Sequence, residues 1–540
     1  MKLLLIILGI YSFSSFGGVN LKNGNFYINY TDVIISGNGP ELSIVRTFNS
    51  KSTHRGWFGF GWGSDFETRL EVSPDGSVTV FENGSGARTR FTPKGSNDPA
   101  IGVDKIISQM KSRANISDVV AENLRERLLG DSELRLAYAR KFKVSSDMKV
   151  GGVLYSSLRG SQKIMRTSKG YKRFYESGKF EEFDSQGNLT LIQQKNGYKV
   201  FLNYKDERVT SIKDTKSKQL FFEWFDSGRV KSISTGSKTK SSYEYDSDGN
   251  LVSSTDIAGN KYRFDYDSYH NMTKVKYSDD REMKISYQPQ TQFVTKIVDK
   301  EGLETKYEYG KNSKNPELHY WTTVKKKTKS GKEFSSKYEY EMKKRPDGSQ
   351  YTYRILTDIS GFVTETTYSE CCGLPLKIVK GEDVTTFEYN KRGLLTKRKS
   401  SDGDFVELDY HPELNKVTKV VNPNGWTKFS YDKQGNLYKA LNNVGKAVLL
   451  KYNRNGRITD MVDYDKKRDI RRSLAFKYNT LGKPTEINLK KVGIIKVDYD
   501  GFGEIKNVSS NSGKKMAVQV TQAFQSLLEI VRPAGVNLSL

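Results

Sequence analysis

The sequence is poor in cysteine, in histidine and in long apolar runs. Its 540 residues include only two cysteines and four histidines. The histidines lie far apart and lack the spacing of zinc ligands, so no metal centre is expected; they are His54, His270, His319 and His411. Beyond the first residues, no stretch is long and apolar enough to cross a bilayer. The chain is therefore not expected to span a membrane.

The two cysteines are neighbours, Cys371 and Cys372, and glycine follows them at Gly373. Adjacent cysteines can close only a small, strained ring, and a disulfide of that kind is easily reduced. Three states are compatible with the pattern: two packed thiols at a turn, a vicinal disulfide, or pairing with another chain.

Catalytic signatures are also missing. The sequence has no Gly-x-Ser-x-Gly elbow and no phosphate-binding loop of the Walker type. Acidic residues are frequent, but they occur in turns and on strand faces, and no pair of them is identified as a general acid and base. The sequence therefore predicts no catalytic, cofactor-binding or metal-ligating residue, and no enzyme. A hydrolase hidden in the N-terminal domain at 18–100 or in the insertion at 101–142 is the alternative, and it would need buried carboxylates with shifted pKa values in a cleft.

A tyrosine recurs at a pitch close to 21 residues along most of the chain. Self-similarity at a fixed period indicates an array of one supersecondary unit. Arrays of this kind usually build surfaces or containers. Phe183, Tyr204 and Phe225 hold the same pitch earlier in the chain. The main repeat anchors are Tyr245, Tyr266, Tyr287, Tyr309, Tyr389, Tyr410, Tyr431, Tyr452, Tyr478 and Tyr499.

Each repeat has the pattern of two short strands and two turns. Aromatic residues alternate with polar ones at Tyr262, Phe264 and Tyr266, which indicates a half-buried strand. The segment Asp246-Ser-Asp-Gly-Asn250 predicts a turn, because Asp and Asn bond their own backbone and Gly accepts positive φ. A lone hairpin cannot bury its aromatic face. Successive hairpins must therefore pair side by side into one continuous sheet.

Tyr-Asp-x-x-Gly-Asn-Leu at this pitch resembles the YD repeat of Rhs proteins, teneurins and the shell subunits of insecticidal Tc toxins, over roughly residues 165–510. The preceding segment is similar to the N-terminal domain of bacterial Rhs proteins, with Arg46, Asn49, Gly61 and Trp62 at the motif positions. The resemblance implies a mainly β fold. It would be a spiralling antiparallel sheet of hairpins that forms a partial or closed shell, in this family often around a cargo polypeptide.

The sequence also departs from the Rhs toxins. Their core usually ends with Asp-Pro-x-Gly-Leu-x-Gly-Gly, after which a variable toxin is released by self-cleavage. Here the Asp98-Pro99 pair lies ahead of the repeats and lacks the closing glycines. No C-terminal toxin and no self-cleavage motif are therefore expected, and a full cocoon is less expected than a partial spiral.

Helical spacing interrupts the β pattern ahead of the repeats. Val120, Leu124 and Leu128 share one helical face, with a cap at Ser117 or Asp118, so an insertion is expected as a lid on the sheet or a docking helix pair. Met1-Lys2 and the short apolar run after it are typical of a secretory signal. The expected segments are a signal peptide at 1–17, an Rhs-type N-terminal β domain at 18–100, the helical insertion at 101–142, the repeat spiral at 143–510 and a C-terminal segment at 511–540.

Positive charge dominates, since 88 Lys and Arg face 63 Asp and Glu, for a formal net charge of +25. Outside the cytoplasm, anionic glycans and envelope components are natural partners of such a surface. No motif supports specific nucleic-acid binding. The sequence thus predicts a non-catalytic scaffold, secreted or in the cell envelope, that binds glycans or other anionic material. The alternative is a shell that encloses a separately encoded toxin or cargo polypeptide.

Overall fold

The computed structural model describes residues 17–531, except for short segments inside that range. The expected signal peptide lies outside the described residues apart from Gly17, and so do Cys371 and Cys372. The segments left out are 38, 93–97, 114–115, 147, 157–161, 237–238, 329, 347, 371–372, 455, 480–482 and 500–504.

Short strands in three small sheets open the chain, and we call them the N-terminal module. Pairing is antiparallel, in the orders β1-β2-β3-β6, β4-β5 and β7-β8-β9. A 3-10 helix at Asp65–Glu67 follows β6. The strands are β1 (Gly17–Asn20), β2 (Asn25–Ile35), β3 (Leu42–Asn49), β4 (Arg55–Gly56), β5 (Gly59–Phe60), β6 (Trp62–Ser64), β7 (Arg69–Val72), β8 (Val78–Glu82) and β9 (Ala87–Phe91).

The expected helical insertion consists of α1 (Pro99–Arg113), α2 (Asp118–Gly130) and α3 (Ser132–Phe142). Ser117 caps α2 by accepting a hydrogen bond from the backbone of Val120. The helices bury a small core of their own, around Val103, Ile106 and Leu128. Ion pairs of Arg140 with Glu71 and of Glu133 with Arg88 tie α3 to the N-terminal module.

The repeats form one antiparallel sheet with 33 strands among the described residues, and each strand pairs with its neighbours in sequence. Strands β10–β25 are called the first half below. They are β10 (Val153–Ser156), β11 (Gln162–Thr167), β12 (Gly170–Tyr175), β13 (Phe180–Phe183), β14 (Leu189–Gln193), β15 (Lys199–Lys205), β16 (Arg208–Asp214), β17 (Gln219–Trp224), β18 (Val230–Ser234), β19 (Lys240–Tyr245), β20 (Leu251–Thr255), β21 (Lys261–Tyr266), β22 (Met272–Lys276), β23 (Glu282–Tyr287), β24 (Val294–Val298) and β25 (Glu304–Lys311).

The middle strands, β26–β32, continue the same meander, and β33–β42 form the second half. The middle strands are β26 (His319–Lys327), β27 (Glu333–Lys344), β28 (Gln350–Ile359), β29 (Phe362–Tyr368), β30 (Pro375–Lys380), β31 (Asp383–Tyr389) and β32 (Leu395–Ser400). Those of the second half are β33 (Phe405–Tyr410), β34 (Val417–Asn422), β35 (Gly425–Tyr431), β36 (Leu437–Asn442), β37 (Lys446–Tyr452), β38 (Ile458–Asp465), β39 (Ile470–Tyr478), β40 (Pro484–Leu489), β41 (Gly493–Tyr499) and β42 (Ile505–Ser510).

The recurring tyrosine explains how one repeat holds the next. Each anchor ring is half-buried, and a β-bulge precedes every anchor except Tyr309, as between Glu244 and Tyr245. Its hydroxyl donates to a backbone carbonyl of the preceding repeat, so every phenol ties two hairpins together. The bonds run from Tyr245 to Val230 (2.9 Å), Tyr266 to Leu251 (2.8 Å), Tyr287 to Met272 (2.9 Å), Tyr309 to Val294 (2.7 Å), Tyr389 to Pro375 (2.8 Å), Tyr410 to Leu395 (2.7 Å), Tyr431 to Val417 (2.8 Å), Tyr452 to Leu437 (2.8 Å), Tyr478 to Ile458 (2.7 Å) and Tyr499 to Pro484 (2.9 Å).

The aspartate after the tyrosine closes the turn as expected. Asp246 accepts the backbone N–H and the side-chain amide of Asn250, at 2.8 and 2.9 Å. Gly249 supplies the positive φ of 88° that this turn needs. The equivalent Gly187 meets the N-terminal module, and its carbonyl accepts from the backbone of Leu70 at 2.9 Å. An added Cβ at Gly187 would lie 2.1 Å from the carbonyl oxygen of Leu70, which permits only glycine there.

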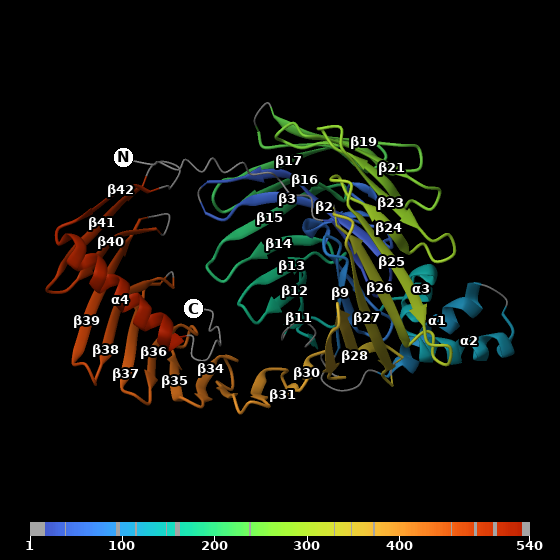
Figure 1. The fold of residues 1–540 in the computed structure, drawn as a ribbon. Coiled ribbons are helices and arrows are strands. Elements are labelled where there is room, and N and C mark those ends of the chain that lie inside the picture. Colours follow the sequence, from blue (N-terminus) through green and yellow to red (C-terminus); the bar gives the residue numbers. More distant parts are fainter. Residues whose placement is uncertain are drawn as a thin grey trace.

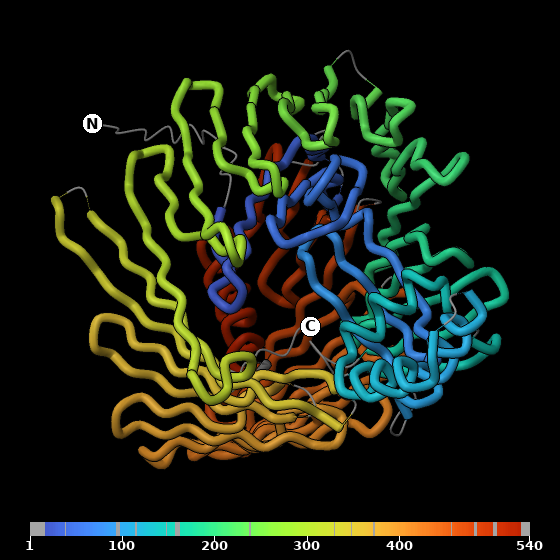
Figure 2. Tube along the Cα trace, turned by 90° about the vertical axis from the view of Figure 1, so that its right-hand side faces the viewer, coloured from blue at the N-terminus to red at the C-terminus, as the bar shows by residue number. Residues whose placement is uncertain are grey.

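The long sheet curls into an open shell rather than a closed one, because its end strands β10 and β42 do not pair. In Figure 1 the first half curves around strands β2 and β3, and the second half stands apart from it, joined through the middle strands. Figure 2 follows the same path from green through yellow to orange, with the blue N-terminal strands inside the curve. The expected spiral of hairpins is confirmed, and the partial shell is the correct alternative.

Two separate hydrophobic cores lie on the inner side of the curve. The first joins the N-terminal module to strands from β10 to β24, and includes Phe26, Trp62, Tyr243 and Phe264. The second joins the second half to α4 (Gly513–Val531), a helix that was not expected from the sequence. Helix α4 crosses β36, β37, β38 and β41 (Figure 1). No described helix combines the length and the apolar character needed to cross a bilayer.

Candidate functional site

A large cavity opens where the first half, the second half and the N-terminal module meet. Its volume is about 2110 Å³. Hairpin turns of both halves line it, so residues more than 200 positions apart in sequence share one space. The lining includes Glu41, Asp65 and Glu82 of the N-terminal module, Arg173, Tyr175, Lys179, Glu181, Gln194, Lys195, Asn196, Tyr198 and Lys216 of the first half, and Lys416, Tyr431, Asp432, Gln434, Tyr452, Arg454 and Arg457 of the second half.

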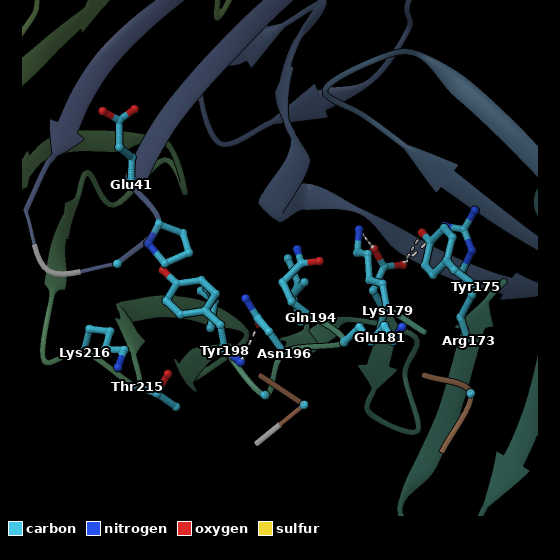
Figure 3. Close-up of a pocket in the computed structure, with 18 of the residues that line it drawn as sticks. Glu41, Arg173, Tyr175, Lys179, Glu181, Gln194, Asn196, Tyr198, Thr215 and Lys216 are labelled. Atoms are coloured by element: carbon cyan, nitrogen blue, oxygen red, sulfur yellow. Dashed lines mark hydrogen bonds and ion pairs between the residues drawn. The ribbon is translucent and has the colours of Figure 1, made fainter. Parts of the chain in front are cut away.

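One end of the cavity holds a compact ion-pair network, which Figure 3 shows at the right. Arg173 is 1% exposed; its Nη2 lies 2.7 Å from Glu82 Oε1 and its Nη1 lies 3.3 Å from Glu181 Oε2. Lys179 Nζ pairs with the second oxygen of Glu181 at 2.8 Å. The hydroxyl of Tyr175 donates to Glu181 at 2.9 Å, and burial raises the pKa of this phenol well above its usual value. Glu181 is thus fully engaged and cannot serve as a free base.

Among the carboxyl groups that line the cavity, Asp65 most resembles a catalytic acid, because its pKa is raised. The surrounding chain desolvates it and raises its pKa, and Lys179 partly offsets the rise. Its side chain still reaches solvent. Of the other carboxylates that line the cavity, Glu82 and Glu181 pair with Arg173, and Asp432 accepts hydrogen bonds from its own turn. Glu41 is exposed and accepts a hydrogen bond from Ser36 at 3.3 Å.

Three further lysines also line the cavity. Lys195 lies in the turn between β14 and β15, Lys216 in the turn between β16 and β17, and Lys416 just before β34. Within the described part of the chain, none of the three ammonium groups forms an ion pair with a carboxylate. Figure 3 shows Lys216 beside Thr215 and Tyr198, away from the network around Arg173. The hydroxyl of Tyr198 is occupied, because it donates to Asp214 at 2.9 Å.

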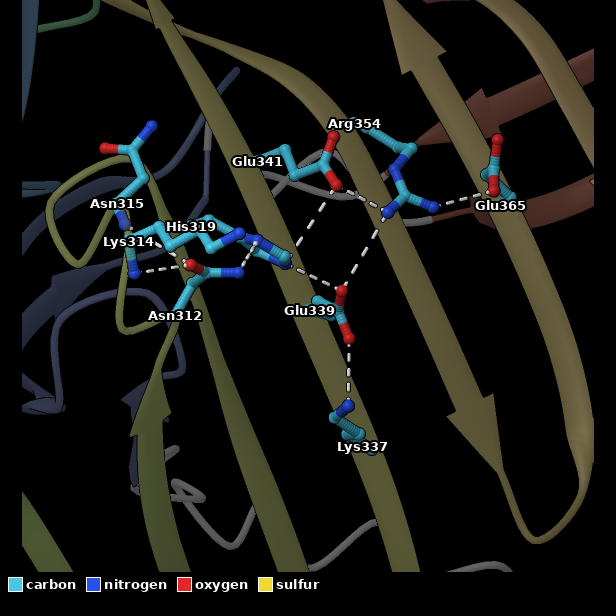
Figure 4. Close-up of polar contacts among 9 residues, drawn as sticks. All are labelled: Asn312, Lys314, Asn315, His319, Lys337, Glu339, Glu341, Arg354 and Glu365. Carbon is cyan, nitrogen blue, oxygen red and sulfur yellow. Dashed lines mark hydrogen bonds and ion pairs between the residues drawn. The ribbon is translucent and has the colours of Figure 1, made fainter.

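A second polar cluster lies on the middle strands, on the sheet face opposite that of Thr322, whose hydroxyl donates to Leu21 of the N-terminal module. His319 Nε2 approaches Glu339 Oε1 at 2.8 Å and Glu341 Oε1 at 3.9 Å (Figure 4). One histidine and two carboxylates within reach of a common point resemble a metal-ligand set. Sequence spacing could not reveal it, because the histidine and the glutamates come from neighbouring strands.

The hydrogen bonds around His319 argue against a metal at this cluster. Asn312 Oδ1 accepts the backbone N–H groups of Lys314 and Asn315, which turns its amide nitrogen toward His319 Nδ1 at 3.1 Å. Nδ1 is therefore the acceptor and Nε2 carries the proton, which it donates to Glu339. A cation at Nε2 would require the other tautomer.

The carboxylates of this cluster are also neutralised by side chains. Lys337 Nζ lies 2.8 Å from Glu339, and Arg354 bridges Glu341 at 2.5 Å and Glu365 at 2.9 Å. The guanidinium of Arg354 holds the pKa of Glu341 below its usual range. We interpret the cluster as a cross-strand ion-pair network that joins β26, β27, β28 and β29.

The N-terminal motif residues connect the module to the sheet. Arg46 is fully buried, with Nε 2.6 Å from Asp32 and Nη2 2.6 Å from Ser254 of β20. Tyr243 donates to the same aspartate at 3.0 Å. Burial raises the pKa of Asp32, and Arg46 opposes that rise. Asp32 Oδ1 and Arg46 Nη1 still lack a hydrogen-bond partner among the described residues.

The other motif residues have structural positions as well. Trp62 Nε1 donates to the hydroxyl of Tyr266 at 3.0 Å, which links the module to a repeat anchor. Asn49 Oδ1 accepts from the amide of Asn25 at 3.0 Å. Gly61 has φ of 76°, and a Cβ there would meet the ring of Phe48 at 2.7 Å. None of these residues lines the cavity.

Two family models match the chain. Residues 17–91 match a domain of unknown function, DUF6531, and residues 162–539 match the teneurin YD-shell. Among curated proteins, the tRNA3(Ser)-specific nuclease WapA of Bacillus spizizenii is 35% identical and the tRNA nuclease WapA of Bacillus subtilis 34% identical, each over 109 residues. The match covers 18% of this chain and only 5% of either relative.

Solved structures with a related arrangement are remote. A crystal structure of TcdB2-TccC3 without its hypervariable C-terminal region aligns over 92% of this chain and 31% of its own, at 10% identity and a TM-score of 0.37. A porin-like protein from Bacteroides uniformis aligns over 42% of this chain and 91% of its own, at 10% identity and a TM-score of 0.13.

Proposed function

This chain belongs to the teneurin YD-shell family, and from that premise we propose that it is a non-catalytic shell scaffold whose inner side receives a polypeptide partner. The observation that supports this proposal is the cavity between the two halves. Its volume of about 2110 Å³ exceeds the roughly 300–1,000 Å³ of common small-molecule pockets. A segment of polypeptide is an occupant of suitable size.

The inner face of the middle strands, which the N-terminal module covers only in part, adds support. Tyr340 defines that face, because Lys22 of the N-terminal module lies 5.4 Å over its ring. By strand alternation, Phe334, Ile359 and Phe362 share the face of Tyr340, and they are 41%, 48% and 81% exposed. Exposed apolar side chains of this size commonly mark a binding surface. A partner that passes from the cavity along the shell would cover them.

Site-specific cross-linking from opposite walls of the cavity tests the proposal. A photoreactive amino acid would replace Asn196 in one variant and Gln434 in another, because these exposed residues line the cavity from the two halves. Lys439, exposed on the outer face of β36, is the control position. We expect the same single polypeptide to be cross-linked from Asn196 and Gln434 in the native host, and not from Lys439. Unrelated products from the two walls, or equal yields at Lys439, would refute the shell role.

Binding of anionic envelope glycans to the outer face is the second candidate. Lys213, Lys439 and Lys451 are exposed on the outer face of the sheet and form no ion pair with a carboxylate in the described residues. The chain carries a formal charge of +25. This role fits a secreted or envelope location, which we propose on the basis of residues 1–17. Retention of the protein on purified envelope polysaccharide at physiological salt would support it, and free passage through such a column would count against it.

A further inference from the structure

The cavity brings together lysines from both halves of the sheet. Lys195 and Lys216 come from turns of the first half, and Lys416 comes from the second half, more than 190 residues later in the chain. The ammonium groups of Lys195 and Lys416 approach each other closely enough to affect each other's charge. Burial lowers the pKa of Lys416, and Lys195 lowers it further. Neither the proposed fold nor the repeat pattern requires such a repulsive pair.

The nearby acidic groups form no ion pair with these lysines in the described part of the chain, although the charge of Asp432 acts to raise the pKa of Lys416. Asp432 faces Lys416, but its carboxylate accepts three hydrogen bonds from its own turn, from Gln434 N, Asn436 N and Asn436 Nδ2. Glu41 accepts from Ser36 at 3.3 Å. The Nζ of Lys416 lies 5.3 Å over the ring of Tyr431, which offers a cation–π contact and no counter-charge. Arg454 and Arg457 also line the cavity and add positive charge.

We propose that Lys195, Lys216 and Lys416 form a site for an acidic segment of polypeptide, which binds across the junction of the two halves. This inference rests on the proposed function and names the chemistry of the partner. The volume of the cavity is too large for a single small anion and too small for a folded domain, whose radius of gyration is about 13 Å at 100 residues. Glutamate and aspartate side chains spaced along an extended segment can reach lysines on both walls.

A defined peptide probe tests the site in the full chain. The probes are fluorescein-labelled peptides of equal length with alternating Glu and Gly, Lys and Gly, or Ser and Gly, measured by fluorescence anisotropy. We expect the Glu-Gly peptide alone to bind, and its affinity to fall as sodium chloride is raised. In the triple variant Lys195→Gln, Lys216→Gln and Lys416→Gln, we expect its Kd to rise about tenfold.

A matched control separates this site from the general basic charge of the protein. Lys213, Lys439 and Lys451 lie exposed on the outer face, and changing all three to Gln removes the same charge. We expect this control variant to bind the Glu-Gly peptide like the wild type. Equal losses in both triple variants, or no loss in either, would overturn the proposal. A triple Lys→Arg variant at 195, 216 and 416, which keeps the charge, should retain binding and thereby exclude misfolding as the cause.

Two further results would decide between partners. A single-stranded oligonucleotide of equal charge that binds more tightly than the peptide, and through the same three lysines, would overturn the assignment to polypeptide. Cross-linking from Asn196 and Gln434 reports separately on the shell role. If those positions capture one polypeptide while the Glu-Gly peptide fails to bind, the acidic-segment inference is wrong and the shell role stands. Peptide binding without any captured polypeptide would support the acidic-segment site and count against the shell role.

Discussion

The two halves of the sheet use the same hairpin, but they cover their inner faces with different structures. In the first half, the N-terminal module fills the curve, and its core includes Phe26, Phe48 and Trp62. It also buries the charged pair of Arg46 and Asp32. In the second half, the amphipathic helix α4 covers the inner face with apolar side chains. The repeat therefore specifies a curved sheet, and a separate element must complete each core.

The middle strands support this conclusion by contrast. The N-terminal module reaches only the first of them, where Leu21 accepts a hydrogen bond from Thr322 and Lys22 lies over Tyr340, and none of the described residues between 341 and 400 is buried. Backbone pairing and cross-strand ion pairs such as Arg354 with Glu341 hold these strands instead. Because stability in sheets depends on burying one face, we expect the two covered halves to be the most stable parts of the chain.

The largest expected effect is at Arg46. Arg46→Ala would leave Asp32 buried without its cation, and breaking a buried ion pair typically costs about 3–5 kcal/mol. We expect the free energy of unfolding of the first half to fall by that amount, measured by urea denaturation with tryptophan fluorescence, to which Trp62 contributes with its ring 4.4 Å from the guanidinium. The double variant Arg46→Ala with Asp32→Asn removes the uncompensated charge and should recover part of the loss. A double variant as unstable as the single one would show that packing, not charge, dominates.

The next effect is on the cover of the second half. Leu527 of α4 is 4% exposed, and Leu527→Ala should cost about 2–3 kcal/mol through lost burial and a residual cavity. Its neighbour Leu528 is 46% exposed, so Leu528→Ala should change stability by less than about 0.5 kcal/mol. Hydrogen exchange should accelerate in β36–β38 of the first variant and stay unchanged in β10–β24. Acceleration in both halves would mean that the sheet unfolds as one unit.

Much of this fold could be predicted from the sequence, because the tyrosine pitch and the Asp-x-x-Gly-Asn turn both act locally. Tyr245 is half-buried and Asp246 closes its turn, as their pattern predicts, whereas the bond from the Tyr245 hydroxyl to Val230 was not predicted. The sheet, its sequential order and the helical insertion are confirmed. Helix α4 was not predicted, although Met516, Val520, Ala523 and Leu527 recur at steps of three and four, which is a helical period. The long β pattern before it favoured more strands.

The candidate site could not be predicted in the same way. The cavity joins turns such as 194–197 and 432–436, and the curvature of the whole sheet decides which turns meet. Curvature accumulates from small twists at every strand pair, so no short pattern encodes it. The His319 cluster was missed for a related reason, since its glutamates stand on the neighbouring strand. The state of Cys371 and Cys372 stays a prediction.

The anchor tyrosines allow the two halves to be compared at one chemical position. Tyr266→Phe removes a bond to the carbonyl of Leu251 and also strands the indole N–H of Trp62, so we expect a loss of about 1–2 kcal/mol. Tyr452→Phe removes only the bond to Leu437, and we expect about 0.5–1 kcal/mol. Urea denaturation of both variants measures the difference. Equal losses would imply that the N-terminal module gains nothing from its bond to the anchor.

The smallest effect concerns the middle strands and depends on pH. The pKa of Glu341 in the folded chain lies below its ordinary value of 4.5, because Arg354 donates a hydrogen bond to it. The stability that this carboxylate contributes is fully present above pH 4.5 and is lost as the pH falls through the lower folded value. Glu341→Gln should therefore be less stable than the wild type at neutral pH by less than about 1 kcal/mol. The difference in stability between the two proteins should disappear on acidification, as followed by hydrogen exchange of β27 and β28. A difference that grows at low pH would contradict the role of this ion pair in holding these strands together.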